Sequence, residues 1–213
     1  MSAFDERRLQ DVEKLKELER QSHSRVKVVR ISGSPANEIE AELHLKTAAS
    51  DSYPSRVEPV TRLRISLAAR YPFVEPTVTI HSPIFHPNVF TSGRICLGLK
   101  WLPSFGLDLL VRRVAQIITF DPTVVNVQSP ANGAAATWYR QAVRSHPNAF
   151  PSDVLNLTEP PAAKTMSWSN AAPTAPARSA VACPHCAAKL ALPRGRSGNV
   201  TCPKCGTSFM ATA

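Results

Sequence analysis

The segment Ile84-Phe85-His86-Pro87-Asn88-Val89-Phe90-Thr91-Ser92-Gly93-Arg94-Ile95-Cys96-Leu97 decides how the first part of this chain is interpreted. It places a polar triplet, His86-Pro87-Asn88, ahead of Cys96, with a glycine turn at Gly93 between them. The next cysteine along the chain is Cys183, so Cys96 has no neighbour in its domain for a disulfide or a four-cysteine zinc site. A lone thiol is either an inert buried residue or a nucleophile, and the inert role is the commoner one.

Further motifs flank this segment in a fixed order. Tyr71-Pro72-Phe73-Val74-Glu75-Pro76 precedes it, whereas Trp101-Leu102-Pro103, an amphipathic helix and Ser129-Pro130-Ala131-Asn132-Gly133-Ala134-Ala135-Ala136 follow it. In order and spacing the series resembles the ubiquitin-conjugating enzymes, whose pattern reads Y-P-x-x-P-P, H-P-N, the active cysteine, W-x-P and S-P-L-N-x-E-A-A. The resemblance covers roughly residues 4 to 145. None of these motifs is rare alone, but all of them in register are specific.

The chain departs from the family pattern at three places. Glu75 stands where the first proline of the pair is usual, and the segment from Cys96 to Trp101 is shorter than usual. The acidic residue often found just before S-P-L-N is missing, and Gln128 and Ser129 stand there instead. These differences suggest a divergent member of bacterial origin, and they leave the identity of the modifier open.

The resemblance implies roles for the residues around the thiol. Cys96 would carry the modifier as a thioester, and Asn88 would stabilise the oxyanion formed when an amine attacks. Turn formation beside Pro87 is the alternative role of Asn88, and it is compatible with the first. The resemblance also implies that His86, Pro87 and Ser129 are structural residues near the site.

The same resemblance implies partners. Phe73 and Pro103 match positions that contact ligases, although both residues could simply pack. Arg7, Arg8 and Lys14 on the first helix match the basic residues that dock on the activating enzyme, although they could equally be solvated. The expected partners are therefore a ubiquitin-like modifier, an activating enzyme, a protein substrate and a ligase. The alternative is a non-catalytic adaptor of the same fold that only binds ubiquitin-like proteins, but such relatives lack the cysteine.

Composition and charge limit the expected cellular location and the expected partners. The chain has 213 residues, 43% of them hydrophobic, and a formal net charge of +9. No apolar run approaches the roughly 18 residues of a membrane span, and no secretory signal stands at the start, so we expect no membrane and a cytoplasmic location. The positive residues are scattered, as with Arg62 and Arg64 on a strand and Arg112 and Arg113 on a helix. Scattered charge favours a solvated surface, so nucleic acid is not an expected partner.

Hydrophobic periodicity predicts an α+β fold: an N-terminal helix, a four-stranded antiparallel meander and C-terminal helices. The predicted helices cover residues 4 to 20 and 107 to 118, with another beginning near Ser129-Pro130 through a serine cap and a proline in its first turn. Strict alternation of apolar and polar residues predicts neighbouring strands. One of these strands carries glutamates on its polar face and the next carries arginines, which suits cross-strand pairing. The predicted strands are 25 to 31, 39 to 46, 61 to 67 and a short one around Val78 and Ile80.

The chain is predicted to have three parts. Residues 1–157 form the conjugating domain, and 158–180, rich in proline and alanine and containing Trp168, form an extended linker. Residues 181–213 form a zinc ribbon, because Cys183, Cys186, Cys202 and Cys205 make two C-x-x-C knuckles with 15 residues between them. Four thiolates suit tetrahedral Zn²⁺ better than disulfides or a redox pair. We expect structural zinc there and no cofactor for the catalytic step.

Overall fold

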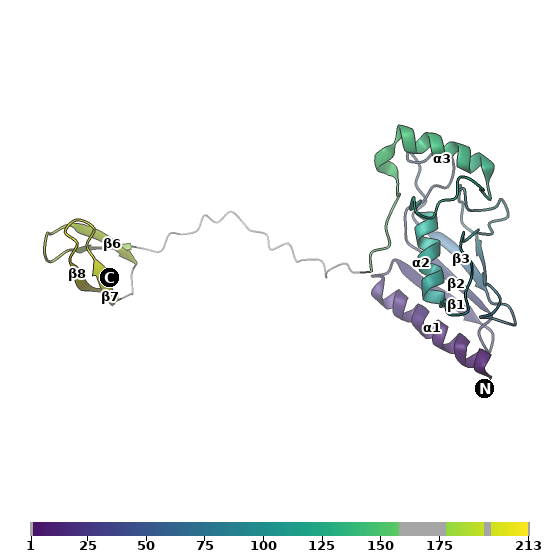
Figure 1. Cartoon of the computed structure of the whole chain (residues 1–213), viewed down its shortest axis with the longest axis horizontal. Coiled ribbons are helices and arrows are strands. Elements are labelled where there is room, and N and C mark those ends of the chain that lie inside the picture. Colours follow the sequence, from purple (N-terminus) through teal and green to yellow (C-terminus); the bar gives the residue numbers. More distant parts are fainter. Residues whose placement is uncertain (1, 158–177, 194–196, 213) are drawn as a thin grey trace. The chain divides into compact units, whose positions relative to one another are not determined.

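The computed structural model describes residues 2–157, 178–193 and 197–212. The chain divides into two compact units, Met1–Pro160 and Pro161–Ala213 (Figure 1). Most of the expected linker, including Trp168, lies outside the described residues. Among the helices of the described part, none combines the length and apolarity that a bilayer crossing requires.

The first unit begins with α1 (Ala3–Gln21), close to the helix predicted for residues 4 to 20. Its start is fixed by a capping box: the Asp5 amide donates to the Ser2 hydroxyl (3.2 Å), and the Ser2 amide donates to the Asp5 carboxylate (2.9 Å). The predicted apolar stripe of this helix, Val12, Leu15 and Leu18, is buried in the core.

The sheet is the predicted antiparallel meander, in the order β1-β2-β3-β4. Its strands are β1 (Val26–Ser32), β2 (Glu38–Leu43), β3 (Thr61–Ser66) and β4 (Thr77–Ile80). The expected cross-strand pairing is confirmed, since Glu40 faces Arg64 and Glu42 faces Arg62, each with a nitrogen–oxygen distance of 3.3 Å. The alternate residues of these strands turn inward and form one half of the core.

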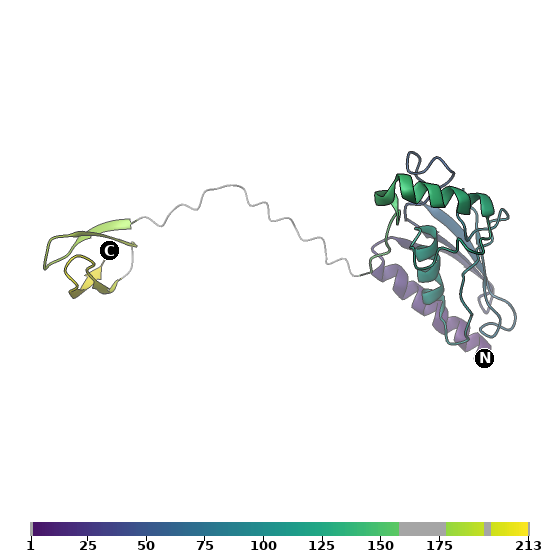
Figure 2. The same ribbon diagram turned by 45° about the horizontal axis from the view of Figure 1, so that its top comes forward.

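The other half of the core comes from α2 (Leu107–Ile118), which has the predicted bounds. Figures 1 and 2 both show α2 across the sheet with α1 beside it, in agreement with the buried residues that the two helices share in one cluster. The buried side chains of α2 are Leu107, Leu110, Val111, Val114, Ala115, Ile117 and Ile118. This packing fixes α2 against the sheet.

The predicted start of the last helix is wrong. α3 runs Gly133–Ser145, and Asn132 is its cap, with a side-chain oxygen that accepts from the amide three residues on (3.1 Å). Ser129 instead exchanges two hydrogen bonds with the Asn126 side chain (2.8 and 2.9 Å). Because that pairing holds Ser129 in a turn, Ser129 and Pro130 precede the helix rather than begin it.

After α3, the chain forms the short helix η1 (Pro147–Ala149) and returns along α2. Asp153 pairs with Arg25 and accepts from the Lys46 amide (3.0 Å), while Leu155 and Leu157 pack against the main core. These contacts anchor the end of the first unit.

The second unit contains two β-hairpins. β5 (Arg178–Ala182) pairs with β6 (Lys189–Pro193), and β7 (Ser197–Thr201) pairs with β8 (Ser208–Thr212). Each hairpin encloses one C-x-x-C knuckle. The first strand begins at Arg178, slightly before the boundary of 181 expected for the ribbon.

Candidate active site

The thiol of Cys96 lies at the end of a tight hairpin that its own segment forms. Gly93 turns the chain with φ of 85°, and a Cβ atom there would lie 2.4 Å from the Ile80 carbonyl oxygen, so only glycine fits. The chain then returns antiparallel to itself, and the Cys96 amide donates to the Asn88 carbonyl (2.7 Å). The glycine turn therefore brings the polar triplet and the cysteine side by side.

Cys96 is partly exposed, between the buried side chains of Ile95 and Leu97. It opens onto a hollow of about 600 Å³ whose rim carries Glu75, Phe90, Arg94, Gly98, Leu99 and Lys100. A thiol in this position is reachable by another macromolecule, unlike an inert core cysteine.

His86 is fully buried beneath the site. Its ring lies 4.3 Å from the Phe120 ring, and its Nδ1 accepts from the Asn88 amide (2.9 Å). Burial lowers the pKa of His86 to about 3, against a smaller opposing effect of the Ile117 backbone. The imidazole is therefore neutral near pH 7, and its contacts are those that a structural role requires.

Asn88 is also fully buried, and its side-chain amide is saturated. The amide nitrogen donates to the carbonyls of Cys96 (3.3 Å) and Val124 (3.1 Å), and the amide oxygen accepts from the Asn126 amide (2.8 Å). Since a primary amide has two N–H bonds, both are occupied. Asn88 thus ties the segment that carries Cys96 to the loop that follows α2.

A second tie comes from the backbone of the triplet. The Pro87 carbonyl accepts from the Asn132 amide (3.1 Å), directly before α3. Together with the Asn126–Ser129 pair, this contact holds residues 126–132 against the triplet. The sequence motifs in this region therefore meet in space, which their spacing alone does not reveal.

Arg113 on α2 is a residue near the thiol that sequence reasoning did not single out. Its guanidinium donates through Nε to the Leu97 carbonyl (3.0 Å) and through Nη2 to the Gly98 carbonyl (3.4 Å). In the sequence, Arg113 is simply one of two adjacent arginines on an amphipathic helix. No local signal distinguishes it from Arg112.

The cysteines of the second unit lie together in a cluster that could hold a metal ion. The four sulfur atoms lie within 4.8 Å of one another, with 3.8 Å between Cys183 and Cys205 and 3.7 Å between Cys186 and Cys202. Four sulfurs placed about 2.3 Å from a tetrahedral Zn²⁺ would be about 3.8 Å apart, so this set fits zinc.

The two knuckles share one backbone pattern. The Ala187 amide donates to the Cys183 carbonyl (2.9 Å), and the Gly206 amide donates to the Cys202 carbonyl (2.8 Å), with φ of 55° and 72° at these turn residues. Hydrogen bonds from Thr207 lower the pKa of Cys205 to about 6, which favours the thiolate that a metal needs.

Comparison with known proteins decides the family of the first unit. The family profile described as "Ubiquitin-conjugating enzyme" matches residues 13–151, more than half of the chain and including the whole thiol site. The chain belongs to the ubiquitin-conjugating enzyme family. The matched range ends before the cysteine knuckles, so it covers the conjugating unit alone.

Curated relatives agree with this family. "Ubiquitin-conjugating enzyme E2 2" of Candida albicans is 37% identical over 82 residues, which are 37% of this chain and 44% of the relative. Proteins of the same name from Mycosarcoma maydis and Debaryomyces hansenii are 33% identical over 88 residues (40% and 45%) and 34% over 82 residues (37% and 46%). The chain thus spans less than half the length of these relatives. The bacterial origin stays a prediction.

The residues predicted to contact partners lie in different environments. Arg8 is buried, and its guanidinium donates to the carbonyls of Ala36, Ala68 and Ala69, so it is not available to a partner. Arg7 is largely occupied by the Asp11 carboxylate (2.5 Å) and the Phe105 carbonyl (2.8 Å).

The other partner positions remain accessible. Lys14 is about half exposed, although it lies 3.5 Å from the Asp11 carboxylate. Phe73 is 63% exposed and packs edge-on against Phe4, with ring centres 6.0 Å apart, and Pro103 is exposed. Of the five positions, these three can contact another protein without breaking buried bonds.

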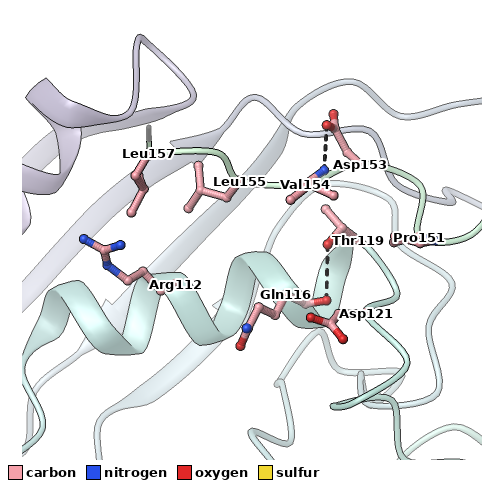
Figure 3. A pocket seen from close by; sticks show the side chains of 9 residues that line it. All are labelled: Arg112, Gln116, Thr119, Asp121, Pro151, Asp153, Val154, Leu155 and Leu157. Atoms are coloured by element: carbon pink, nitrogen blue, oxygen red, sulfur yellow. Dashed lines mark hydrogen bonds between the residues drawn. The ribbon is translucent and has the colours of Figure 1, made fainter. Parts of the chain in front are cut away.

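Figure 3 shows another hollow, of about 220 Å³, between α2 and residues 151–157. The Arg112 side chain points toward Leu157 at one end, and Asp153 and Val154 lie at the other. None of the residues predicted to carry function lines it. It lies where the end of the first unit runs along α2.

Proposed function

We propose that the protein is a conjugating enzyme that accepts the activated carboxyl terminus of a ubiquitin-like modifier as a thioester on Cys96. It then transfers that modifier to an amine of a target protein. The observation that carries the proposal is the partly exposed thiol on a segment that hydrogen bonds hold on both sides, within a family of conjugating enzymes.

The chemistry balances without a strong base at the site. The Cys96 sulfur attacks the carbonyl of the activating enzyme's thioester, a new C–S bond forms, and the activating enzyme's thiol leaves. The target amine then attacks the Cys96 thioester, a C–N bond forms, Cys96 leaves as a thiolate, and the amine's proton passes to water. Because a thiolate both attacks and leaves readily, the neutral His86 need not take part.

Asn88 contributes by shaping the site. Its saturated amide supports the loop-forming role, since an oxyanion could receive an N–H only after the bond to the Cys96 or Val124 carbonyl is broken. The oxyanion role is the competing proposal for this residue, and it predicts a different mutant phenotype.

The second unit is proposed to hold one structural Zn²⁺ on Cys183, Cys186, Cys202 and Cys205. A segment this small cannot bury a sufficient core, so the metal would supply much of its folding free energy. The chain has no Asp or Glu after Glu159. Its Lys and Arg side chains therefore give the second unit a positive charge, and Zn²⁺ with four thiolates, which carries two negative charges, offsets part of it. Because the net positive charge that remains is small, we propose that the ribbon holds a substrate, ligase or modifier rather than nucleic acid.

The exposure of individual side chains indicates which surfaces could contact partner proteins. Phe73 and Pro103 are proposed to contact a ligase, because both are exposed and an exposed aromatic ring offers an anchor that another protein can bury. Lys14 is proposed to contribute to docking on the activating enzyme, because it is more accessible than Arg7 and Arg8, the other two basic residues predicted to dock there.

A pulse-chase experiment distinguishes the enzyme from the adaptor of the same fold. The protein is charged with ubiquitin by the ubiquitin-activating enzyme and ATP, the charging is stopped, and free lysine is added. An enzyme loses its adduct to lysine at a rate that rises with lysine concentration. An adaptor would instead bind ubiquitin reversibly, and Cys96→Ala would bind as tightly as the wild type.

A further inference from the structure

The loop that follows the thiol has little backbone support of its own. In the described part of the chain, the hydrogen bonds on residues 97–100 all come from Arg113, which reaches the loop from α2. Nε and Nη2 of one guanidinium meet the carbonyls of two consecutive residues, Leu97 and Gly98. A planar group with donors in a fixed arrangement determines the orientation of both peptide units.

The backbone at Gly98 has a φ of 63°, which favours glycine. A Cβ atom there would make only ordinary contacts, 3.6 Å from Arg113 Nη2 and 4.0 Å from Asn88 Nδ2. The loop therefore lies between two side chains: Asn88 holds the Cys96 carbonyl, and Arg113 holds the next two carbonyls. Cys96 is fixed from both directions along the chain.

We propose that Arg113 is a positioning residue, which holds the short loop so that the thioester on Cys96 is presented to the amine in one geometry. This inference rests on the proposed function. It concerns a contact between α2 and this chain's shortened loop. Misplacement of a reacting group by about 1 Å can reduce a rate roughly 10²-fold, so loosening the loop has a measurable consequence.

Arg112 is a matched control. It is the preceding residue of the same helix and carries the same charge, but it points toward Leu157 and lines the hollow of Figure 3. Arg112→Met and Arg113→Met therefore remove the same charge from the same helix. Only the second removes the two bonds to the loop.

The test uses full-length protein and two kinds of measurement. Trypsin nicking after the exposed Lys100 reports loop opening and needs no partner protein. Discharge of ubiquitin-charged protein to free lysine reports the reaction. We expect Arg113→Met to be nicked about tenfold faster and to discharge about tenfold more slowly at saturating lysine, with the half-saturating lysine concentration within about twofold.

Two further variants distinguish the hydrogen bonds of Arg113 from its charge and from its effect on the stability of the domain. Arg113→Lys keeps the charge but not the planar pair of donors, so it should recover only part of the discharge rate. Arg112→Met should match the wild type in both measurements, and all melting temperatures are recorded alongside.

Normal nicking and discharge within about twofold in Arg113→Met would overturn the inference, as would full recovery in Arg113→Lys. If the wild type takes no ubiquitin, ubiquitin is not its modifier, whereas the nicking rates still decide whether Arg113 holds the loop.

Discussion

Replacement of Asn88 by alanine should weaken the whole thiol site rather than a single chemical step. The substitution removes three hydrogen bonds, to the carbonyls of Cys96 and Val124 and from the Asn126 amide. Each such bond contributes about 1 kcal/mol net, so the loss sums to about 3 kcal/mol. For a protein of this size, each kcal/mol lowers the melting temperature by roughly 2–4 °C, which predicts a decrease of about 6–12 °C.

The kinetic consequence follows from the same contacts. Because Asn88 fixes the Cys96 carbonyl, its loss should slow the charging of Cys96 and the discharge to lysine by similar factors. Single-turnover charging and single-turnover discharge, with a melting curve on each sample, measure all three quantities. Asn156→Ala is the control, since Asn156 is an exposed asparagine of the same domain.

One pattern of results would refute this reasoning. If Asn88→Ala melted like the wild type, charged at the normal rate and lost roughly 10²–10³ in discharge alone, the amide would act on the oxyanion. The three observed bonds would then be incidental to catalysis.

The remaining predictions concern the metal, the modularity of the chain and pH. The intact protein should contain one zinc per chain by elemental analysis, and Cys183→Ser should lose it; a protein that folds its second unit equally well after chelation would contradict the site. A chain ending at Leu157 should melt within about 2 °C of the first unit of the full protein, because Leu155 and Leu157 pack on the core and Asp153 pairs with Arg25. His86 has a pKa lowered from 6.5 to about 3 by burial, so the unfolded chain binds an additional proton between these values. The effect of His86 on the free energy of unfolding is therefore absent above pH 6.5. Below that pH, the free energy of unfolding decreases by about 1.4 kcal/mol per pH unit, or about 2 kcal/mol by pH 5. Denaturant unfolding should show this slope in the wild type and not in His86→Gln.

Much of the conjugating fold could be predicted because its signals are local. The alternation of Ile39, Ala41 and Leu43 determines which face of β2 is buried, and glutamates on one strand with arginines on the next predict that β2 and β3 pair. The spacing of the α2 residues likewise fixes both its bounds and its buried side. Periodicity carries this information without reference to the rest of the molecule.

The errors and omissions have a common physical cause, which is contact between distant segments. A serine followed by proline is typical of a helix start, but Asn126 binds Ser129 and leaves the cap to Asn132. Arg8 has the sequence context of a solvated helix residue, yet carbonyls from two other segments bury it. The saturation of Asn88 also depends on Val124 and Asn126, beyond the reach of motif reasoning.

The measurement that tests the central claim most directly is the intact mass of the protein after charging with ubiquitin, its activating enzyme and ATP. We predict an increase by one ubiquitin that a thiol reagent removes, no increase in Cys96→Ala, and a reagent-resistant ester in Cys96→Ser. A thiol-sensitive adduct that persists in Cys96→Ala would contradict the assignment of Cys96.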